Sequence, residues 1–382
     1  MNCDKLFDKI DELSDKYVDI LEDICNIESP TAYKEGVDKV GRYFIEYAKE
    51  RTWDVDVCFQ QISGNAICIT VNPEAKGAPI ALSGHMDTVH PVGSFGTPAV
   101  KRIGKNMYGP GTRDCKGGLV GALLAIEALC QCGFDRRPIL FLLQSDEENG
   151  SATSKKETIK YICDKAANAE AFLNLEGIRG FTAVLTRKGI MRIKFVVTGK
   201  AAHSSECYNG VSAIAEAAHK IIELEKLKDM GGITCNCGII SGGNTANTVP
   251  ERCEFIADIR FVDSIQRQTA YNVVRSIAER TYLDGCSCEI LEISYRPPME
   301  YSEKNEALLR RMNEIYKSVG LTELTPREAS GGSDAAYVTE RGIPCVDSIA
   351  VSGGPIHTIY EYADIDSVAE TAKRIASVIY CL

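Results

Sequence analysis

The chain has 382 residues, of which 45% are hydrophobic, and its 53 acidic and 43 basic side chains give a net charge of −10. This length exceeds what a single hydrophobic core usually supports, so we expect two domains. The acidic balance and the lack of a basic cluster argue against nucleic acid and anionic membrane surfaces as partners. No stretch of the sequence has the apolar length of a membrane span.

The first ten residues and the cysteines bear on the cellular compartment. Residues 1–10 are charged and lack the apolar segment of a secretory signal, so we predict a cytoplasmic protein. The 16 cysteines are scattered, and several lie within apolar runs. Three pairs have C-x-C rather than C-x-x-C spacing, namely Cys130/Cys132, Cys235/Cys237 and Cys286/Cys288. We interpret the cysteines as reduced thiols that fill core space, not as disulfides or zinc ligands.

Helical and extended patterns alternate through the first half of the chain. The predicted elements are helices over residues 4–27, 33–51 and 116–133, and strands over 66–71, 79–84, 137–144 and 169–175. The third helix is rich in alanine and ends at a glycine, as many helices do. The third strand is a continuous apolar run, which is typical of a strand buried on both faces. This alternation indicates an α/β layered fold.

The pattern changes after Gly189. The next predicted elements are a strand over 190–198, a helix over 211–227, strands over 233–240 and 252–261, a helix over 265–283 and a strand over 287–293. This βαββαβ order is that of a split βαβ sandwich. A helix over 305–319, a strand over 344–349 and a helix over 366–380 follow. We therefore predict a discontinuous α/β domain, residues 1–186 and 293–382, interrupted by a small α+β domain, residues 187–292.

His85 and Asp87 come at the end of the predicted strand that begins near Ile80. In α/β folds, ligand sites form at the carboxyl edge of the sheet. A histidine binds a metal through one ring nitrogen when a neighbouring group holds the other nitrogen, and a carboxylate two residues away is a usual holder. The alternative interpretation is a strand end with a turn-forming aspartate.

Acidic residues and a histidine recur at other strand ends and loops. Asp114 lies in a glycine-rich loop, where a helix cap is the alternative. The three carboxylates at 146–148 repel one another, which favours a bound cation, with a solvated acidic loop as the alternative. Glu176 and His357 lie in similar settings. Histidine, aspartate and glutamate without cysteine form the ligand set of hydrolytic zinc, cobalt or manganese sites.

The sequence contains only five histidines, and three lie outside these candidate ligands. His219 falls within the predicted helix over 211–227, and we interpret it as a surface or packing residue. His90 has no neighbour in the sequence that suggests a role. His203 lies among small residues, where the backbone can approach a ligand closely.

Seven motifs follow one another in a fixed order along the chain. They are Ser83–Val89, Gly111–Gly118, Asp146–Ser151, Lys188-Gly189, Gly199–Ser205, Asn247–Pro250 with Arg260, and His357 with Glu361-Tyr362. In this order they resemble the M20 metallopeptidase family, which includes glutamate carboxypeptidases, succinyl-diaminopimelate desuccinylases, acetylornithine deacetylases, aminoacylases and peptidase T. The resemblance spans nearly the whole chain.

The resemblance implies both a fold and a metal centre. The implied fold is a mixed-sheet, phosphorylase/hydrolase-like zinc-peptidase catalytic domain with an inserted α+β (βαββαβ, ferredoxin-like) lid and dimerisation domain. The implied cofactors are two divalent metal ions, Zn²⁺ or in its place Co²⁺ or Mn²⁺. His85, Asp114 and Glu176 would bind one ion, and Asp114, Glu148 and His357 would bind the other, so that Asp114 bridges the two.

The same resemblance implies the catalytic and substrate-binding residues. Glu147 would be the general acid and base, and Asp87 would orient the first metal-binding histidine. His203 would reach the substrate carbonyl, in family dimers usually from the partner subunit. Asn247 and Arg260 would bind the carboxylate end of the substrate.

The implied activity is hydrolysis of the amide bond of a peptide or N-acyl amino acid that has a free carboxylate. Glu176, in place of aspartate, resembles the carboxypeptidase and desuccinylase branch more than the aminoacylase and peptidase T branch. Within this group we expect a glutamate-carboxypeptidase-like enzyme. An N-acyl amino acid deacylase, of the acetylornithine or succinyl-diaminopimelate type, and a di- or tripeptidase are the alternatives. The expected partner is a second copy of the chain, bound through the inserted domain. Cys115 and Ile359-Tyr360 depart from the usual motifs, so the role of that thiol and the local substrate preference stay open.

Overall fold

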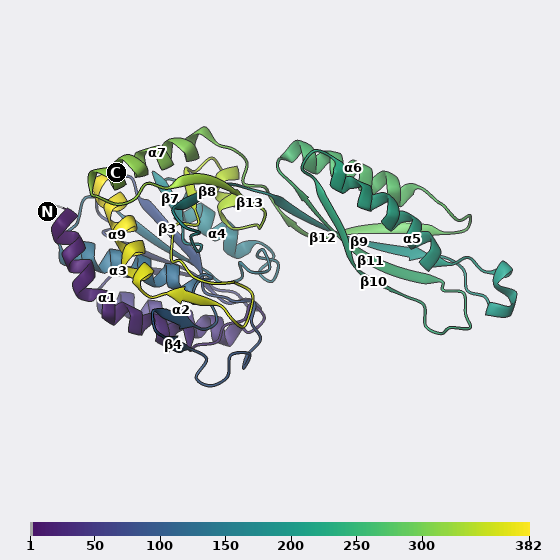
Figure 1. The fold of residues 1–382 in the computed structure, drawn as a ribbon, viewed down its shortest axis with the longest axis horizontal. Helices are drawn as coiled ribbons and strands as arrows, with labels where there is room; N and C mark the ends of the chain where they lie inside the picture. The colour runs from purple at the N-terminus through teal and green to yellow at the C-terminus, as the bar shows by residue number, and fades with distance from the viewer. Residues whose placement is uncertain (1–2) are drawn as a thin grey trace. The chain divides into compact units, whose positions relative to one another are not determined.

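The computed structural model describes residues 3–382, which divide into two compact units (Figure 1). Unit 1 contains the residues up to Thr186 together with Tyr301–Glu328 and Ser333–Leu382. Unit 2 contains Arg187–Glu300 and Ala329–Gly332. Each unit has a hydrophobic core of its own. Among residues 3–382, no helix combines the length and the apolar character that crossing a membrane requires.

Unit 1 is built on an eight-stranded mixed sheet. In spatial order its strands are β1 (Asp54–Cys58), β2 (Ala66–Val71), β6 (Ile139–Gln144), β3 (Ile80–His85), β7 (Ala171–Asn174), β14 (Cys345–Asp347), β8 (Thr182–Arg187) and β13 (Thr325–Ala329). β3 runs parallel to both β6 and β7, and β14 runs parallel to β7, whereas β2 is antiparallel to β6. The carboxyl ends of the four parallel strands therefore meet at one edge of the sheet.

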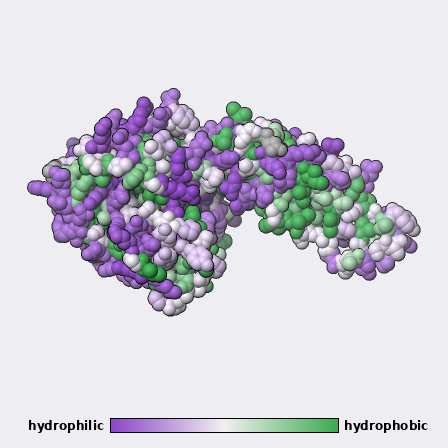
Figure 2. All heavy atoms as spheres, in the orientation of Figure 1, coloured by the Kyte–Doolittle hydropathy of each residue, from purple (hydrophilic) through white to green (hydrophobic). Residues whose placement is uncertain are grey.

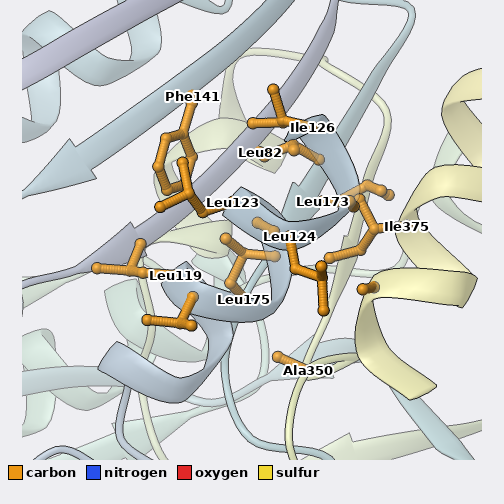
Figure 3. Close-up of a cluster of buried hydrophobic side chains, with 14 of the residues drawn as sticks. Leu82, Leu119, Leu123, Leu124, Ile126, Phe141, Leu173, Leu175, Ala350 and Ile375 are labelled. Carbon is orange, nitrogen blue, oxygen red and sulfur yellow. The ribbon is translucent and has the colours of Figure 1, made fainter. Parts of the chain in front are cut away.

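Helices pack on the sheet of unit 1, and most belong to one large hydrophobic core. They are α1 (Cys3–Cys25), α2 (Lys34–Glu50), α3 (Lys116–Gln131), α4 (Glu157–Lys165), α7 (Glu303–Ser318), α8 (Ala335–Glu340) and α9 (Asp366–Cys381). α3 is the central helix, and nearly all of its residues are buried. Figure 3 shows its leucines lying between Leu82, Phe141 and Leu173 of the sheet and Ile375 of α9. An apolar helix of this kind is stable only when neighbours cover it all round.

Two glycines bring the first turn of α3 close to loops that matter for the site. A Cβ atom at Gly117 would lie 2.2 Å from the carbonyl oxygen of Thr112, and one at Gly118 would lie 2.1 Å from that of Leu175. No larger residue fits at either position without moving the backbone. The glycines thus fix the distance between α3 and the segments that carry Asp114 and Glu176.

A small second sheet in unit 1 joins two distant segments. It consists of β15 (Tyr362–Asp364), β5 (Asn106–Tyr108) and β4 (Lys101–Ile103). β15 pairs with β5 in antiparallel register, with Tyr362 opposite Tyr108. The loop that leads to Asp114 and the loop that follows His357 are therefore tied together.

Unit 2 is an antiparallel sheet with two helices. Along the chain its main elements are β9 (Gly189–Thr198), α5 (Ala213–Leu224), β10 (Thr234–Gly242), β11 (Arg252–Phe261), α6 (Ser264–Glu279) and β12 (Ser287–Arg296). The spatial order of the strands is β10-β11-β9-β12. The stacked rings of Phe195 and Phe255, 4.4 Å apart, lie in its core. Figure 2 shows hydrophobic residues gathered on the surface of this unit as well, and the exposed ones include Ile239 and Leu291 on the two edge strands.

The structure confirms the α/β class with a large mixed sheet, and the βαββαβ order is present in unit 2. The predicted helix over 265–283 was too long, because Lys220 Nζ binds the carbonyl oxygens of Ile277, Ala278 and Arg280 and so ends α6 early. Several elements were missed, namely β1, β4, β5, β8, β13, β15, α4 and α8. They have only three to nine residues, too few for a clear periodic pattern.

Candidate metal centre

The candidate ligands follow the carboxyl ends of neighbouring strands in unit 1. His85, the last residue of β3, is opposite Gln144, the last residue of β6. Ser83 of β3 is opposite Asn174 of β7, which in turn is opposite Asp347 of β14. The loops that leave these strands therefore start side by side and can converge on one site.

His85 faces two carboxylates across a buried gap. Its Nε2 atom lies 3.1 Å from Asp114 Oδ1 and 3.7 Å from Glu176 Oε1. Its Nδ1 atom lies 2.9 Å from the carbonyl oxygen of Asp87 and 3.4 Å from Asp87 Oδ1. A carbonyl oxygen only accepts hydrogen bonds, so Nδ1 carries the hydrogen and Nε2 is left to bind a metal.

His357 faces the same aspartate from the other side. Its Nε2 atom lies 3.2 Å from Asp114 Oδ2 and 3.2 Å from Glu148 Oε2. The backbone of His357 has a φ of 61°, which is uncommon for a residue with a side chain and is often found at functional sites. The two oxygens of Asp114 thus point to two different histidines, which is the arrangement of a bridging carboxylate.

The donor atoms suit a pair of metal ions. Within each of the two groups, His85–Asp114–Glu176 and Asp114–Glu148–His357, the donor atoms lie within 4.8 Å of one another. Ligands at the usual metal distances in a tetrahedral site are about 3.3 Å apart, close to the separations seen here. Imidazole and carboxylate donors without thiolate match zinc, cobalt or manganese.

The charges at the site also favour a cation. Burial and the charge of Asp114 raise the pKa of Glu148 to about 8, and the same two causes raise the pKa of Glu176 well above its usual value. Hydrogen bonds to Asp114 and Glu148 raise the pKa of His357 to about 10. These shifts arise because several carboxylates share one buried site, and a divalent ion held there would supply the compensating positive charge.

Asp87 holds more of the site than the sequence indicated. Its carboxylate is fully buried, and Oδ1 accepts the backbone N–H of Glu147 at 3.1 Å. Oδ2 accepts the backbone N–H of Glu148 at 3.2 Å and the hydroxyl of Thr31 at 2.7 Å. One side chain thus fixes both the imidazole of His85 and the loop that carries Glu147 and Glu148.

Cys115 follows the bridging aspartate but is not among the candidate metal ligands. Its buried thiol donates to the carbonyl oxygen of Leu175 at 3.0 Å, one residue before Glu176. A Cβ atom at Gly84 would lie 2.9 Å from this sulfur atom. The thiol therefore ties the start of α3 to the Glu176 loop. Asp114 is not the cap of α3, because Cys115 occupies that position.

His203 and Asn247 are neighbours in unit 2. The backbone N–H of Ser205 donates to His203 Nδ1 at 3.2 Å, so the ring hydrogen is on Nε2 and can be donated to a ligand. The backbone N–H of Ser204 donates to the carbonyl oxygen of Asn247 at 2.9 Å. His203 is exposed, and this leaves its Nε2 atom accessible.

Arg260 lies at the other end of unit 2. Its side chain donates to Asp258 Oδ1 at 3.1 Å and to the carbonyl oxygen of Ser330 at 2.8 Å, close to where the chain enters and leaves the unit. Asn247 precedes the first residue of β11, and Arg260 is near its last, so the two ends are about 27 Å apart at the usual rise of a strand. One copy of unit 2 does not bring Arg260 together with His203 and Asn247.

Comparison with known proteins decides the family. The model of peptidase family M20/M25/M40 matches residues 81–380. The chain belongs to this family. As an M20 protein it is a hydrolase of the metallopeptidase and amidohydrolase group, which acts on peptide or amide bonds.

The curated relatives of this M20 chain have different names. Carboxypeptidase G2 of Pseudomonas sp. (strain RS-16) is 27% identical over 368 residues, which cover 94% of this chain and 87% of the relative. A "probable succinyl-diaminopimelate desuccinylase" of Staphylococcus aureus (strain MRSA252) is 26% identical, with 84% and 91% covered. The crystal structure of a Staphylococcus aureus tripeptidase superposes with a TM-score of 0.77 at 23% identity, with 99% and 98% covered. The last match supports the M20 fold alone.

The M20 site includes two residues whose roles the sequence did not reveal. His90 has no neighbour in the sequence that suggests a role, but in the structure its Nε2 atom lies 3.0 Å from Glu361 Oε2. Both side chains are buried. Glu361 belongs to a matching motif, but its partners are far away in the sequence, so no local signal could identify them.

Proposed function

We propose that this M20 protein is a dinuclear-metal-dependent hydrolase that cleaves the amide bond of a peptide or N-acyl amino acid with a free carboxylate. Its preferred substrates are those of a glutamate-carboxypeptidase-like enzyme. One observation carries the proposal: Asp114 directs Oδ1 to His85 and Oδ2 to His357, each within 3.2 Å. A carboxylate shared in this way is suited to holding two ions side by side.

The catalytic roles follow from the chemistry of each side chain. Divalent ions held by the His85–Asp114–Glu176 and Asp114–Glu148–His357 groups would supply Lewis-acid chemistry for the substrate carbonyl and the attacking water. Glu147 takes a proton from the attacking water and returns it to the leaving amine. The buried carboxylate of Asp87 keeps Glu147 in place through its backbone N–H. His203 donates from Nε2 to the carbonyl oxygen as negative charge develops there.

Substrate binding involves the two ends of unit 2 and, we infer, a homodimer. Arg260 and Asn247 bind the carboxylate of the substrate, and His203 lies beside Asn247. Because Arg260 is about 27 Å from that end within one chain, His203 and Asn247 reach the substrate from a second copy. Exposed apolar residues on the edge strands of unit 2, such as Ile239 and Leu291, are available to a dimer interface.

Two other substrate classes are alternatives to the glutamate-carboxypeptidase type. The desuccinylase relative, at 26% identity, favours an N-acyl amino acid deacylase almost as well as carboxypeptidase G2 favours a carboxypeptidase. A di- or tripeptidase is the third. A panel of dipeptides, a tripeptide and acetyl- and succinyl-amino acids, assayed with added Zn²⁺, Co²⁺ or Mn²⁺, separates the three. A substrate with glutamate at its carboxyl end is expected to be hydrolysed best.

Replacement of Glu147 by glutamine tests the mechanism. We expect kcat to fall about 100- to 10,000-fold, because the proton acceptor is lost. Metal content, measured by elemental analysis, is expected to stay as in the wild type, since Glu147 is not among the ligands. Glu340→Gln, which changes an exposed glutamate, is the matched control. Wild-type activity in Glu147→Gln contradicts the assignment of the general base.

A further inference from the structure

The buried carboxylate of Glu361 joins segments that are far apart in the sequence. Glu361 Oε1 accepts two backbone N–H groups, those of Arg113 and Asp114, each at 3.0 Å. Its other oxygen, Oε2, faces His90 Nε2 at 3.0 Å. Only 1% of Glu361 and 7% of His90 is exposed. A carboxylate has room for these three hydrogen bonds, and burial makes each of them costly to lose.

Each of the three segments carries one candidate metal ligand. His90 is five residues after His85 on the segment that leaves β3. Asp114 itself supplies one of the two N–H groups. Glu361 is four residues after His357. The carboxylate therefore lies where the backbones of three ligand-bearing segments converge.

A second contact closes the same pair of loops. The Arg113 guanidinium donates to the carbonyl oxygen of Gly354, on the His357 loop, at 2.9 Å. It also donates to the carbonyl oxygen of Ile178, just beyond Glu176, at 3.1 Å. The side chain of Glu361 thus accepts from the backbone of the Asp114 loop, and the side chain of Arg113 donates to the backbone of the His357 loop.

His90 is held in one orientation. The ring of Phe95 packs edge-on against it, with centroids 4.9 Å apart and an interplanar angle of 87°. Since the Glu361 carboxylate accepts, the hydrogen is on His90 Nε2. His90 thereby fixes the rotation of the Glu361 carboxyl group, and this aims Oε1 at the two backbone N–H groups.

We propose that His90 and Glu361 are positioning residues that set the separation between Asp114 and His357, and so the affinity and geometry of the second metal ion. The proposal rests on the metal centre of the proposed function. His90 is not among the candidate metal ligands. It acts through Glu361, whose two backbone contacts locate the bridging aspartate.

Calorimetric titration of Zn²⁺ into chelator-treated protein tests the proposal. In His90→Ala we expect one of the two binding events to weaken about 10- to 100-fold, the usual effect of removing a partner of a metal ligand. The Co²⁺ absorption spectrum is expected to change with it, and kcat to fall while KM stays close to that of the wild type. His90→Gln keeps an N–H donor of similar reach and is expected to restore the affinity and the spectrum.

The controls separate positioning from folding and from the proposed function itself. His219→Gln changes the one histidine outside the site, which stacks on Tyr282 in unit 2, and is expected to behave as the wild type. Glu361→Gln keeps an acceptor for the backbone N–H groups and is expected to weaken the same binding event less than His90→Ala. A folded His90→Ala protein with wild-type metal affinity and spectrum would overturn the positioning role and leave the hydrolase intact. A wild-type protein that binds no divalent ion would overturn both.

Discussion

The metal-binding edge of unit 1 and the exposed end of unit 2 are built in different ways. In unit 1, the buried carboxylates of Asp87 and Glu361 each accept at least two backbone N–H groups from ligand-bearing loops. In unit 2, His203 is exposed, and its Nδ1 atom contacts the hydroxyl and the backbone N–H of its neighbour Ser205. The first region is held by buried hydrogen bonds, whereas the imidazole of the second is open to solvent.

The largest effect that can separate these regions is expected for His203→Ala. Loss of a hydrogen-bond donor to the developing negative charge should lower kcat about 100- to 1,000-fold. Metal affinity should not change, because His203 lies in unit 2 and the ligand groups in unit 1. Steady-state kinetics and zinc titration measure the two effects, with His219→Gln as the control. If His203→Ala also bound metal more weakly, this would contradict the separate roles of the two regions.

Asp87→Asn is expected to act on both properties. The amide would set an N–H group against the backbone N–H groups of Glu147 or Glu148, so both the His85 side and the Glu148 side of the centre should loosen. We expect a loss of about 10- to 100-fold in metal affinity and in kcat. Thr31→Val removes one donor to the same carboxylate and should have a smaller effect. Equal effects of the two variants would show that Asp87 does not hold the loop.

The pH dependence of metal binding tests the metal-binding edge of unit 1 directly. His357, whose hydrogen bonds to Asp114 and Glu148 raise its pKa to about 10, and Glu148, whose burial and proximity to Asp114 raise its pKa to about 8, both carry protons at neutral pH. Binding of the second ion must displace them, so apparent affinity rises with pH below about 8, by up to about tenfold per unit for each proton.

Calorimetry in two buffers of different ionisation enthalpy measures this proton release. We expect binding of the second metal ion to release about two protons near neutral pH. Fewer protons should be released as the pH approaches the pKa of Glu148. Release of no protons, or affinity that falls with rising pH in this range, would contradict the assigned ligands.

The smallest effect on activity is expected at the chain ends of unit 1. The sulfur atoms of Cys3 on α1 and Cys381 on α9 lie 3.9 Å apart. Exchange with glutathione disulfide should join them, with two glutathione thiols released, and stabilise the fold by about 2–4 kcal/mol. Because neither cysteine is among the candidate metal ligands, kcat should not change. Thermal melts and intact mass check the link. Cys381→Ser should abolish it, and Cys207→Ser, at an exposed cysteine of unit 2, should not.

Much of the fold could be predicted from the sequence, because its signals are local. Helical periodicity identified α1, α2 and α9, and a continuous apolar run identified β6. The βαββαβ order was readable for the same reason. Short elements such as α4 and β15 were not predicted, since a few residues do not establish a periodic pattern. The strand β15 also pairs with a strand that is distant in the chain.

The sequence by itself determined which acidic and histidine residues follow the predicted strands or lie in glycine-rich loops, and its resemblance to the M20 family implied the ligand set His85, Asp114, Glu148, Glu176 and His357. Only the tertiary structure decided what holds them. The contacts of Asp87 with Thr31, of Cys115 with Leu175 and of Glu361 with His90 join segments separated by 56, 60 and 271 residues. The motif placed Asn247 and Arg260 together as substrate-binding residues, but in the structure they lie toward opposite ends of β11. Hydrogen bonds depend on positions in space, and a linear motif records only the order of the chain.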